Sequence, residues 1–344
     1  MFIHIGHNLF SSSLLAFIIG STPVSCSNTF AVSYDYRPTM EHVMTSSHLT
    51  QTLQRTVFTK KVQYGELDCI QVRHPFFSAD LLLQGAHLLS FKPNDKNDWL
   101  WLSETAEFRK GVSVRGGIPV CWPWFGNPDR NPDKVQEFIL DPHSAPAHGI
   151  ARAADWQLTA VNESSDAVEL TLELPEIDSQ VWSGGATATI VFTFTKSGLT
   201  VNLITLAGDQ AVSFSQALHT YFPTSDISAT RVQGFHGLAY VDALDDWSEK
   251  QQRGDIHFSE ETDRIYTAGP LQTLVTPEQT LELNCNSASA VVWNPWVEKS
   301  KRLSQFPHDA WQRMFCVESA NALHDYVTLQ PNESHSLTMS LRQR

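Results

Sequence analysis

Short stretches in which apolar and polar residues alternate are the feature of this sequence that most restricts its fold. In residues 168–174 every second residue is valine or leucine, so four apolar side chains would lie on one face of an extended strand. Residues 187–194 are rich in β-branched and aromatic side chains, and residues 199–203 alternate again after a Lys-Ser-Gly turn. This arrangement predicts a β-hairpin. No stretch long enough for a typical helix has a clean apolar stripe with a period of 3.6 residues.

Further strand-like segments follow at short intervals, separated by turns rich in Gly, Pro, Asn and Asp. They are residues 212–217, 281–283, 290–293 and 337–341. Many short strands with such turns are typical of antiparallel sandwiches and barrels. No Ser/Gly-rich linker and no change of composition divides this part of the chain. We therefore predict an all-β protein with one domain over residues 46–344.

Composition excludes several classes of protein. The chain has 344 residues, of which 42% are hydrophobic and 18% charged, as expected for a chain that folds. With 24 Lys+Arg against 37 Asp+Glu the formal net charge is −13, which argues against a nucleic-acid partner. The five cysteines are scattered and form no CxxC, so neither a disulfide framework nor a structural zinc site is expected.

The N-terminal segment differs from the rest of the chain. Residues 14–19 are apolar and precede small residues, as in a signal peptide, but no Lys or Arg comes before them. The stretch is also far shorter than the roughly 20 residues that span a bilayer. Either the protein is exported, or translation begins at Met40 or Met44. We expect residues 1–45 to be a poorly ordered extension, and the protein to be cytoplasmic with no membrane partner.

Several common catalytic motifs are missing from the sequence. It contains no GxGxxG, no GxxxxGK[ST] and no HExxH, which argues against dinucleotide, nucleotide and zinc-protease sites. Residues 111–115 lack the closing glycine of a nucleophile elbow, and no His-x-His pair starts a metal site on a strand. We therefore expect a site without metal or cofactor.

Two segments contain arginines in unusual surroundings. Residues 115–126 combine glycines, prolines and aromatic side chains with Arg115, whose planar guanidinium suits phosphate or carboxylate. Glycines beside this arginine would let the backbone approach a ligand closely. The alternative is a tightly packed aromatic loop with Arg115 in a surface ion pair. Further along, His148 and Arg152 lie four residues apart beside a glycine and would converge on one anionic or polyhydroxyl ligand. The alternative here is a histidine that caps a loop.

Two further segments contain candidates for proton transfer. His219 lies at the end of an apolar strand, four residues before Pro223, and histidine exchanges protons near neutral pH. It could equally be a core histidine. Glu318 lies within an apolar strand, where burial is costly unless the carboxylate is paired or functional, and burial would raise its pKa. The alternative is a structural glutamate bonded to backbone amides.

Taken together, these segments resemble the D-hexose-6-phosphate mutarotases (glucose-6-phosphate 1-epimerases) of the aldose 1-epimerase superfamily. The segments that carry the resemblance, in order, are residues 115–126, 148–152, 218–222, 234–242, 292–296 and 316–318. It covers about residues 55–344. The resemblance implies a galactose mutarotase-like antiparallel β-supersandwich with a pocket on a concave face.

The resemblance also implies a reaction, the interconversion of the α and β anomers of a hexose 6-phosphate. The general base of the family corresponds to Glu318 and its general acid to His219. Proton removal from the C1 hydroxyl and proton addition to the ring oxygen open the hemiacetal, and neither needs a metal or a cofactor. The implied partner is a small sugar phosphate, and we expect a monomer.

Other pocket residues follow from the same resemblance. His148 matches a second pocket histidine, and Asp242 matches the carboxylate that holds sugar hydroxyls. Arg115 and Arg152 match pocket arginines, of which at least one would bind the phosphate, and Lys299 is a further candidate for the same anion. The choice between a phosphorylated and a free sugar therefore depends on the two arginines.

Two other functions are compatible with the sequence. A carbohydrate-binding or sensory protein could keep the aromatic pocket without the chemistry, although both the acid and the base are present here. A glycoside hydrolase or lyase would need two carboxylates beside the scissile bond, and Asp242 with Glu318 is such a pair.

Overall fold

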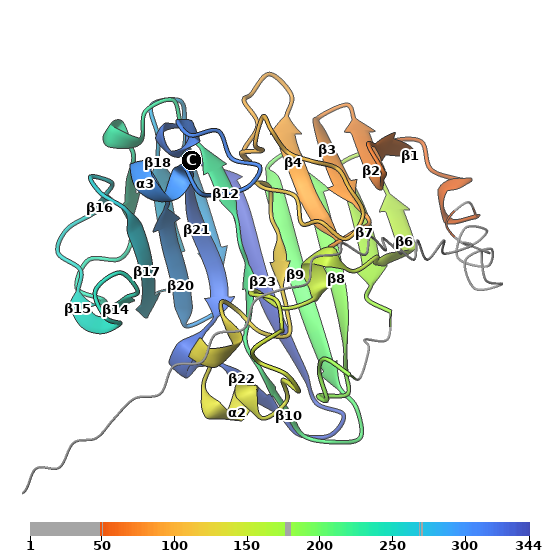
Figure 1. The fold of residues 1–344 in the computed structure, drawn as a ribbon. Coiled ribbons are helices and arrows are strands. Elements are labelled where there is room, and N and C mark those ends of the chain that lie inside the picture. The colour runs from red at the N-terminus through yellow and green to blue at the C-terminus, as the bar shows by residue number, and fades with distance from the viewer. Residues whose placement is uncertain (1–48, 50, 176–179, 268, 270) are drawn as a thin grey trace, which may run out of the picture. The chain divides into compact units, whose positions relative to one another are not determined.

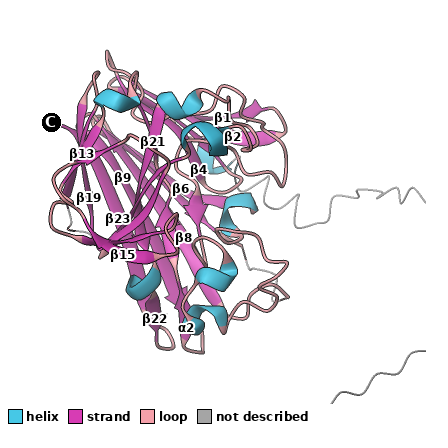
Figure 2. Cartoon of the chain, turned by 60° about the vertical axis from the view of Figure 1, so that its left-hand side comes forward, coloured by secondary structure: helices cyan, strands magenta, loops and turns pink. Residues whose placement is uncertain are grey.

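The structure is a computed structural model. It describes residues 49, 51–175, 180–267, 269 and 271–344. These residues belong to one compact unit, and the expected N-terminal extension, residues 1–45, lies outside them. All pairings between the described strands are antiparallel, and helices are short, as in α2 (Asp133–Gln136) and α3 (Trp296–Ser300). Figure 2 shows these helices in the connections between strands. The predicted all-β antiparallel class is confirmed.

The largest sheet in the described part of the chain has nine strands. In spatial order they are β16 (Ile256–His257), β13 (Arg231–Gln233), β18 (Leu271–Val275), β19 (Thr280–Cys285), β23 (Ser334–Gln343), β9 (Gly198–Ala207), β8 (Ala186–Thr195), β7 (Ala167–Glu173) and β6 (Gln157–Glu163). The strands β8 and β9 form the predicted hairpin, with Thr195 opposite Gly198. Buried and less buried residues alternate along both strands, because one face of the sheet packs against the core.

A second sheet of eight strands contributes most of the residues that matter below. Its strands, in chain order, are β5 (Val120–Cys121), β11 (Gln216–Leu218), β12 (Tyr221–Pro223), β14 (Ala239–Asp242), β15 (Ser248–Gln251), β17 (Thr262–Thr267), β20 (Ser289–Asn294) and β21 (Met314–Asn321). All eight residues of β21 are buried, so both faces of this strand are covered. Figure 1 shows β14, β17, β20 and β21 side by side, with β12 next to β21.

Two smaller sheets complete the described architecture. One consists of β1 (Thr59–Tyr64), β2 (Leu67–His74), β3 (Phe77–Leu82) and β4 (His87–Pro93), and the other of β10 (Val212–Phe214) and β22 (Val327–Leu329). The four-stranded sheet packs on the nine-stranded sheet through aromatic rings. The ring of Phe194 in β8 lies 5.8 Å from that of Phe91 and 6.3 Å from that of Phe77.

One predicted strand is wrong in its extent. The sequence predicts a continuous strand over residues 212–217, but the structure divides this segment between β10 and β11, which belong to different sheets. Ser215 lies between them, and its hydroxyl accepts a hydrogen bond from the Phe125 N–H at 2.8 Å. This contact comes from a remote part of the chain, so local alternation did not reveal it. The segments predicted at 281–283, 290–293 and 337–341 lie within β19, β20 and β23.

The described residues include no helix that combines the length and the apolarity needed to cross a bilayer.

Candidate active site

Two neighbouring strands bring His219 and Glu318 together. His219 follows directly after β11, and Glu318 lies in β21, whose antiparallel register sets Leu218 opposite Ser319. Nε2 of His219 is 3.4 Å from Oε1 of Glu318. The Glu318 side chain is 1% exposed and that of His219 is 12% exposed. The structure thus joins the two residues for which the sequence predicts acid and base roles.

Burial changes the proton affinity of Glu318. Loss of solvent raises its pKa well above the ordinary value, and the negative charge of Asp263 raises it further. Its Oε2 is buried and has no hydrogen-bond partner among the described residues. The alternative of a structural glutamate bonded to backbone amides is therefore not supported. A buried carboxyl group with a free oxygen is suited to exchange protons with a ligand.

The surroundings of His219 lower its pKa, whereas those of Glu318 raise the pKa of the carboxyl group. Burial lowers the pKa well below the ordinary value, and His148, Arg115 and Arg152 lower it further. The ring stacks on Tyr221 at 4.9 Å between centroids, which fixes its plane. Its Nδ1 is buried and lacks a partner in the described part of the chain. Without a ligand, the neutral imidazole is therefore the favoured form.

His148 lies beside His219 in an unusual backbone conformation. The two imidazole rings are 5.5 Å apart at their centroids and nearly perpendicular. The φ angle of His148 is +66°, and its Nδ1 accepts a hydrogen bond from the Gly126 N–H at 3.3 Å. Burial lowers its pKa to about 3, so it is neutral near pH 7. His148 thus combines the two interpretations left open by the sequence, because it holds a loop and lines the site.

Arg115 and Arg152 supply positive charge to the same place. Nη1 of Arg115 donates a hydrogen bond to the Tyr221 hydroxyl at 3.4 Å, and Nη2 of Arg152 donates to the Ala147 carbonyl at 2.8 Å. Both side chains are partly buried, and neither forms an ion pair with a carboxylate in the described residues. The alternative of a surface ion pair for Arg115 is thus wrong. Two partly buried cations without counter-ions make a site that favours an anion.

The glycines beside Arg115 have a different role from the expected one. Gly116 and Gly117 have φ angles of +113° and +62°, which favour glycine. A Cβ on Gly117 would collide with the Leu88 carbonyl oxygen, and one on Gly116 with the Trp101 carbonyl oxygen. The glycines therefore let this loop pack against neighbouring backbone, and it is this packing that positions Arg115.

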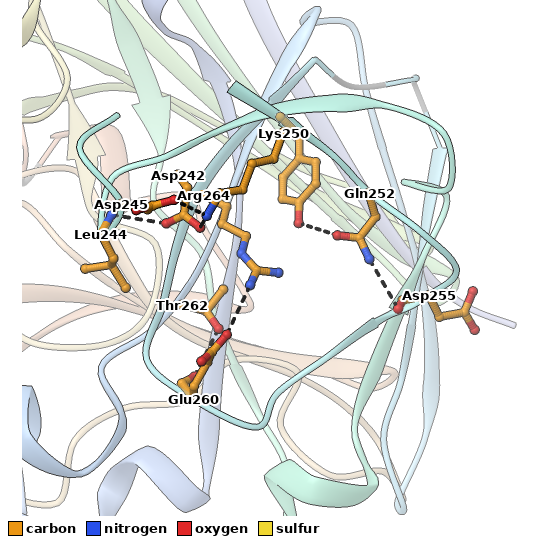
Figure 3. Close-up of polar contacts among 10 residues, drawn as sticks. Asp242, Leu244, Asp245, Lys250, Gln252, Asp255, Glu260, Thr262 and Arg264 are labelled. Carbon is orange, nitrogen blue, oxygen red and sulfur yellow. Dashed lines mark hydrogen bonds and ion pairs between the residues drawn. The ribbon is translucent and has the colours of Figure 1, made fainter. Parts of the chain in front are cut away.

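Asp242 and Lys299, both predicted as ligand-binding residues, are engaged by other side chains. A carboxylate oxygen of Asp242 lies 2.8 Å from Nζ of Lys250, and the other accepts a hydrogen bond from the Leu244 N–H at 3.1 Å (Figure 3). These contacts leave the rival hydrolase pair of Asp242 and Glu318 without support. Nζ of Lys299 lies 3.3 Å from both Glu261 and Asp263, so its charge is already paired.

A cavity opens next to residues that surround the His219–Glu318 pair. Its lining includes His148, whose ring lies 5.5 Å from that of His219, and Asp263, together with Arg130, Trp247 and Leu323. Three of these residues have left-handed backbone, with φ angles of +66° at His148, +57° at Trp247 and +52° at Leu323. Such conformations are costly for residues other than glycine and gather at functional sites. The cavity therefore has the features of a ligand site.

The sequence places this chain in a known family. It matches the family model described as aldose 1-epimerase over residues 68–342. The protein belongs to the aldose 1-epimerase family. The similarity includes strand β21 with Glu318 and the segments that contain His219, Arg115 and His148.

Relatives within the aldose 1-epimerase family have related names. The chain is 35% identical over 285 residues to a "Putative glucose-6-phosphate 1-epimerase" of Escherichia coli, covering 80% of this chain and 90% of that protein. A protein of the same name from the plant Cenchrus ciliaris is 31% identical over 271 residues, covering 74% and 78%.

Solved structures of epimerases share the fold. A crystal structure described as a "putative mutarotase" from Salmonella typhimurium superposes with a TM-score of 0.75 at 30% identity, covering 85% of this chain and 96% of that chain. The galactose 1-epimerase of Lactobacillus acidophilus gives 0.66 at 14% identity, covering 84% and 99%. The expected galactose mutarotase-like fold is confirmed.

The structure of this epimerase-family protein also adds residues to the site that the sequence did not single out. Asp263, in β17, raises the pKa of Glu318, and its own pKa is raised by burial and lowered by Lys299. Arg130 lies over the ring of Trp247, with its Cζ 5.3 Å from the centroid. The signal that identified Glu318 is a carboxylate within an apolar strand, and it does not apply to Asp263, because β17 also contains Arg264 and two threonines. Arg130 and Trp247 have no such local signal.

Proposed function

We propose that this protein interconverts the α and β anomers of a hexose 6-phosphate, of which glucose 6-phosphate is the first candidate. The observation that carries the proposal is the buried His219–Glu318 pair with two arginines beside it that have no carboxylate partner among the described residues. The pair supports acid–base chemistry, and the arginines support an anionic substrate. The names of the relatives from Escherichia coli and Cenchrus ciliaris agree with this substrate.

In the proposed reaction Glu318 removes the proton of the C1 hydroxyl while His219 gives a proton to the ring oxygen. The bond between C1 and the ring oxygen breaks, and C1 becomes an aldehyde. Rotation about C1–C2 turns the other face of the carbonyl toward the ring hydroxyl. When the ring closes, His219 takes back a proton and Glu318 returns one, so the protein ends in its starting state. A general acid or base typically accelerates such a step by about 10²–10⁴-fold.

The substrate itself supports the protonated form of His219 that this reaction requires. The positive charges of Arg115 and Arg152 lower the pKa of His219 in the structure without ligand. A phosphate dianion between these arginines would offset their field, so the pKa of His219 would rise on binding. An unphosphorylated sugar lacks this effect. The proposal therefore links recognition of the phosphate to protonation of the acid.

The remaining features of the proposal follow from this chemistry. The reaction needs no cofactor, and its partner is a small sugar phosphate rather than a nucleic acid or a membrane. We propose a cytoplasmic monomer, since phosphorylated sugars are formed and consumed inside cells.

NMR saturation transfer between α- and β-glucose 6-phosphate tests the proposal, with free glucose and galactose measured in parallel. We expect faster exchange for the phosphorylated sugar. Enhancement for the free sugars alone would retain the acid–base pair and exclude the phosphate role of the arginines. Lack of enhancement for any sugar, with the protein folded, would favour the carbohydrate-binding alternative.

Replacement of the pair tests the residue roles. We expect Glu318→Gln and His219→Ala each to reduce turnover at least about a hundredfold while the fold is kept. Glu282→Gln is a matched control, because this glutamate of β19 forms ion pairs with Arg342 and Arg344 and is not part of the acid–base pair. Near-normal turnover of both pair variants would exclude the proposed roles.

A further inference from the structure

Cys316 lies next to the acid–base pair but has no role in the proposed reaction. It comes two residues before Glu318 in β21, so the two side chains lie on the same face of the strand. The side chain of Cys316 is fully buried. Its thiol makes no hydrogen bond with the residues that the structure describes. Acid–base catalysis alone does not explain a thiol at this position.

The donor atoms of His219, Cys316 and Glu318 converge. One ligand atom from each, an imidazole nitrogen, a sulfur and a carboxylate oxygen, lie within 4.8 Å of one another. In the same two side chains, Oε2 of Glu318 and Nδ1 of His219 are buried and without a hydrogen-bond partner among the described residues. Imidazole, thiolate and carboxylate are the ligands that zinc binds in proteins.

We propose that His219, Cys316 and Glu318 form a binding site for zinc, and that the bound ion inhibits the enzyme. The inhibition rests on the proposed function, whereas binding of the metal does not. Three protein ligands leave the fourth position of a tetrahedral zinc ion for a water molecule or a sugar hydroxyl. The ion would occupy the oxygen and nitrogen atoms that otherwise exchange protons with the sugar.

Tetrahedral coordination of zinc by these three residues requires only side-chain movement. Zinc–ligand bonds of about 2.0–2.3 Å in a tetrahedron place neighbouring donor atoms about 3.3–3.8 Å apart. The donors here lie within 4.8 Å, so rotations that move them about 1 Å inward would close the site. The Nε2–Oε1 distance of 3.4 Å between His219 and Glu318 already fits.

The charge balance also favours a divalent ion. On binding, the thiol of Cys316 and the carboxyl group of Glu318 each release a proton to solvent, so that a thiolate and a carboxylate neutralise the two charges of the metal. Burial and the charge of Glu318 raise the pKa of the free thiol well above its ordinary value, so without metal it is a neutral, unreactive group. Arg115 opposes a cation here, and Asp263 favours it.

Cobalt(II) binds to zinc sites and has absorption bands that zinc lacks, so it tests metal binding independently of the sugar reaction. We expect the full-length protein to bind one cobalt ion with a thiolate-to-metal charge-transfer band, and zinc to abolish this band. Cys316→Ser should lose the band. Cys121→Ser is the matched control and should keep it, because Cys121 is equally buried but its Sγ lies 3.6 Å from His148 instead. If Cys316→Ser does not fold, His219→Ala is measured in its place and should also lose the band.

Zinc inhibition of anomer exchange is the second measurement. We expect the zinc concentration that halves exchange to rise at least tenfold in Cys316→Ser relative to the unmodified protein. Absence of the band from the unmodified protein, or its persistence in Cys316→Ser, would overturn the metal site. Equal zinc sensitivity of the two proteins would overturn the inhibition. A cobalt band in a protein that exchanges no sugar would leave the metal site standing and exclude the proposed function alone.

Discussion

At the scale of single residues, two arginines that have no carboxylate partner in the described part of the chain add to the effect of burial on the histidines of the site. Arg115 and Arg152 both lower the pKa of His219, and Arg152 and Arg115 also lower that of His148. Two histidines are therefore kept neutral by burial and by neighbouring positive charge. An anion that binds between these groups would be attracted by the arginines and would change the protonation of His219.

Replacement of Arg115 tests this role. We expect Arg115→Ala to raise the KM for glucose 6-phosphate about 10- to 100-fold, since a hydrogen bond to a charged group contributes about 1.5–3 kcal/mol. The KM for free glucose should change little. Steady-state kinetics with both sugars gives the comparison, and an unchanged KM for the phosphorylated sugar would place the phosphate elsewhere.

His87 makes folding sensitive to acid. It is fully buried, its Nε2 lies 2.6 Å from the Gly116 carbonyl oxygen, and burial lowers its pKa to about 4. The unfolded chain, with an ordinary pKa near 6.5, therefore binds more protons between these two values. The free energy of unfolding should fall as the pH drops from about 6.5 to about 4, by about 3 kcal/mol from this residue.

Urea unfolding at pH 7.5 and pH 5 measures this effect. His87→Gln should show a smaller loss of stability between the two pH values than the unmodified protein, because the amide does not titrate. An equal loss in both proteins would assign the acid sensitivity to other groups, of which His148 is the first candidate, since its pKa is lowered to about 3.

At the scale of elements, the β14–β15 hairpin forms one wall of the cavity. Nζ of Lys250 lies 2.8 Å from both Asp242 and Asp245 and so ties the two strands to the turn between them (Figure 3). That turn contains Trp247, whose left-handed backbone directs it to the cavity beside Arg130. Asp242 thus contributes to the site through the shape of the hairpin.

Loss of the ion pairs of Lys250 with Asp242 and Asp245 should make the hairpin on this side of the cavity less rigid. We expect Lys250→Gln to raise KM severalfold while kcat changes less than about twofold, because the acid–base pair lies on other strands. Lys61→Gln is the matched control, since Lys61 forms a comparable pair with Asp68 on β1 and β2 at 2.7 Å. Equal KM values in all three proteins would show that the hairpin does not contribute to binding.

At the scale of the whole molecule, the site depends on strands that are far apart in the sequence. His219 and Glu318 become neighbours because β11 pairs with β21, and Arg115 and His148 are added by loops that precede β11. The eight-stranded sheet in turn packs on the nine-stranded sheet, for example through the Thr220 hydroxyl and Met339 Sδ at 3.4 Å. The geometry of the pair is thus a property of the entire fold.

Residues 1–45 are outside the residues that the structure describes. The first described strand begins at Thr59 and the family similarity at residue 68. We therefore expect a variant without residues 1–45 to unfold at the same temperature and to exchange sugar anomers at the same rate as the full chain. Circular dichroism and saturation transfer measure the two properties, and a clear loss of either would give the extension a role in the folded protein.

The sequence alone was sufficient for the all-β class, for the hairpin of β8 and β9 and for the family, because alternation and motif order are properties of contiguous segments. The division of residues 212–217 between two sheets was not predictable, since it depends on a hydrogen bond from Phe125 to Ser215. Only the tertiary structure showed that Asp242 pairs with Lys250, that Lys299 pairs with Asp263, and that Cys316 lies beside the acid–base pair. The partner of a charged side chain comes from another strand, and its identity depends on how the strands pack.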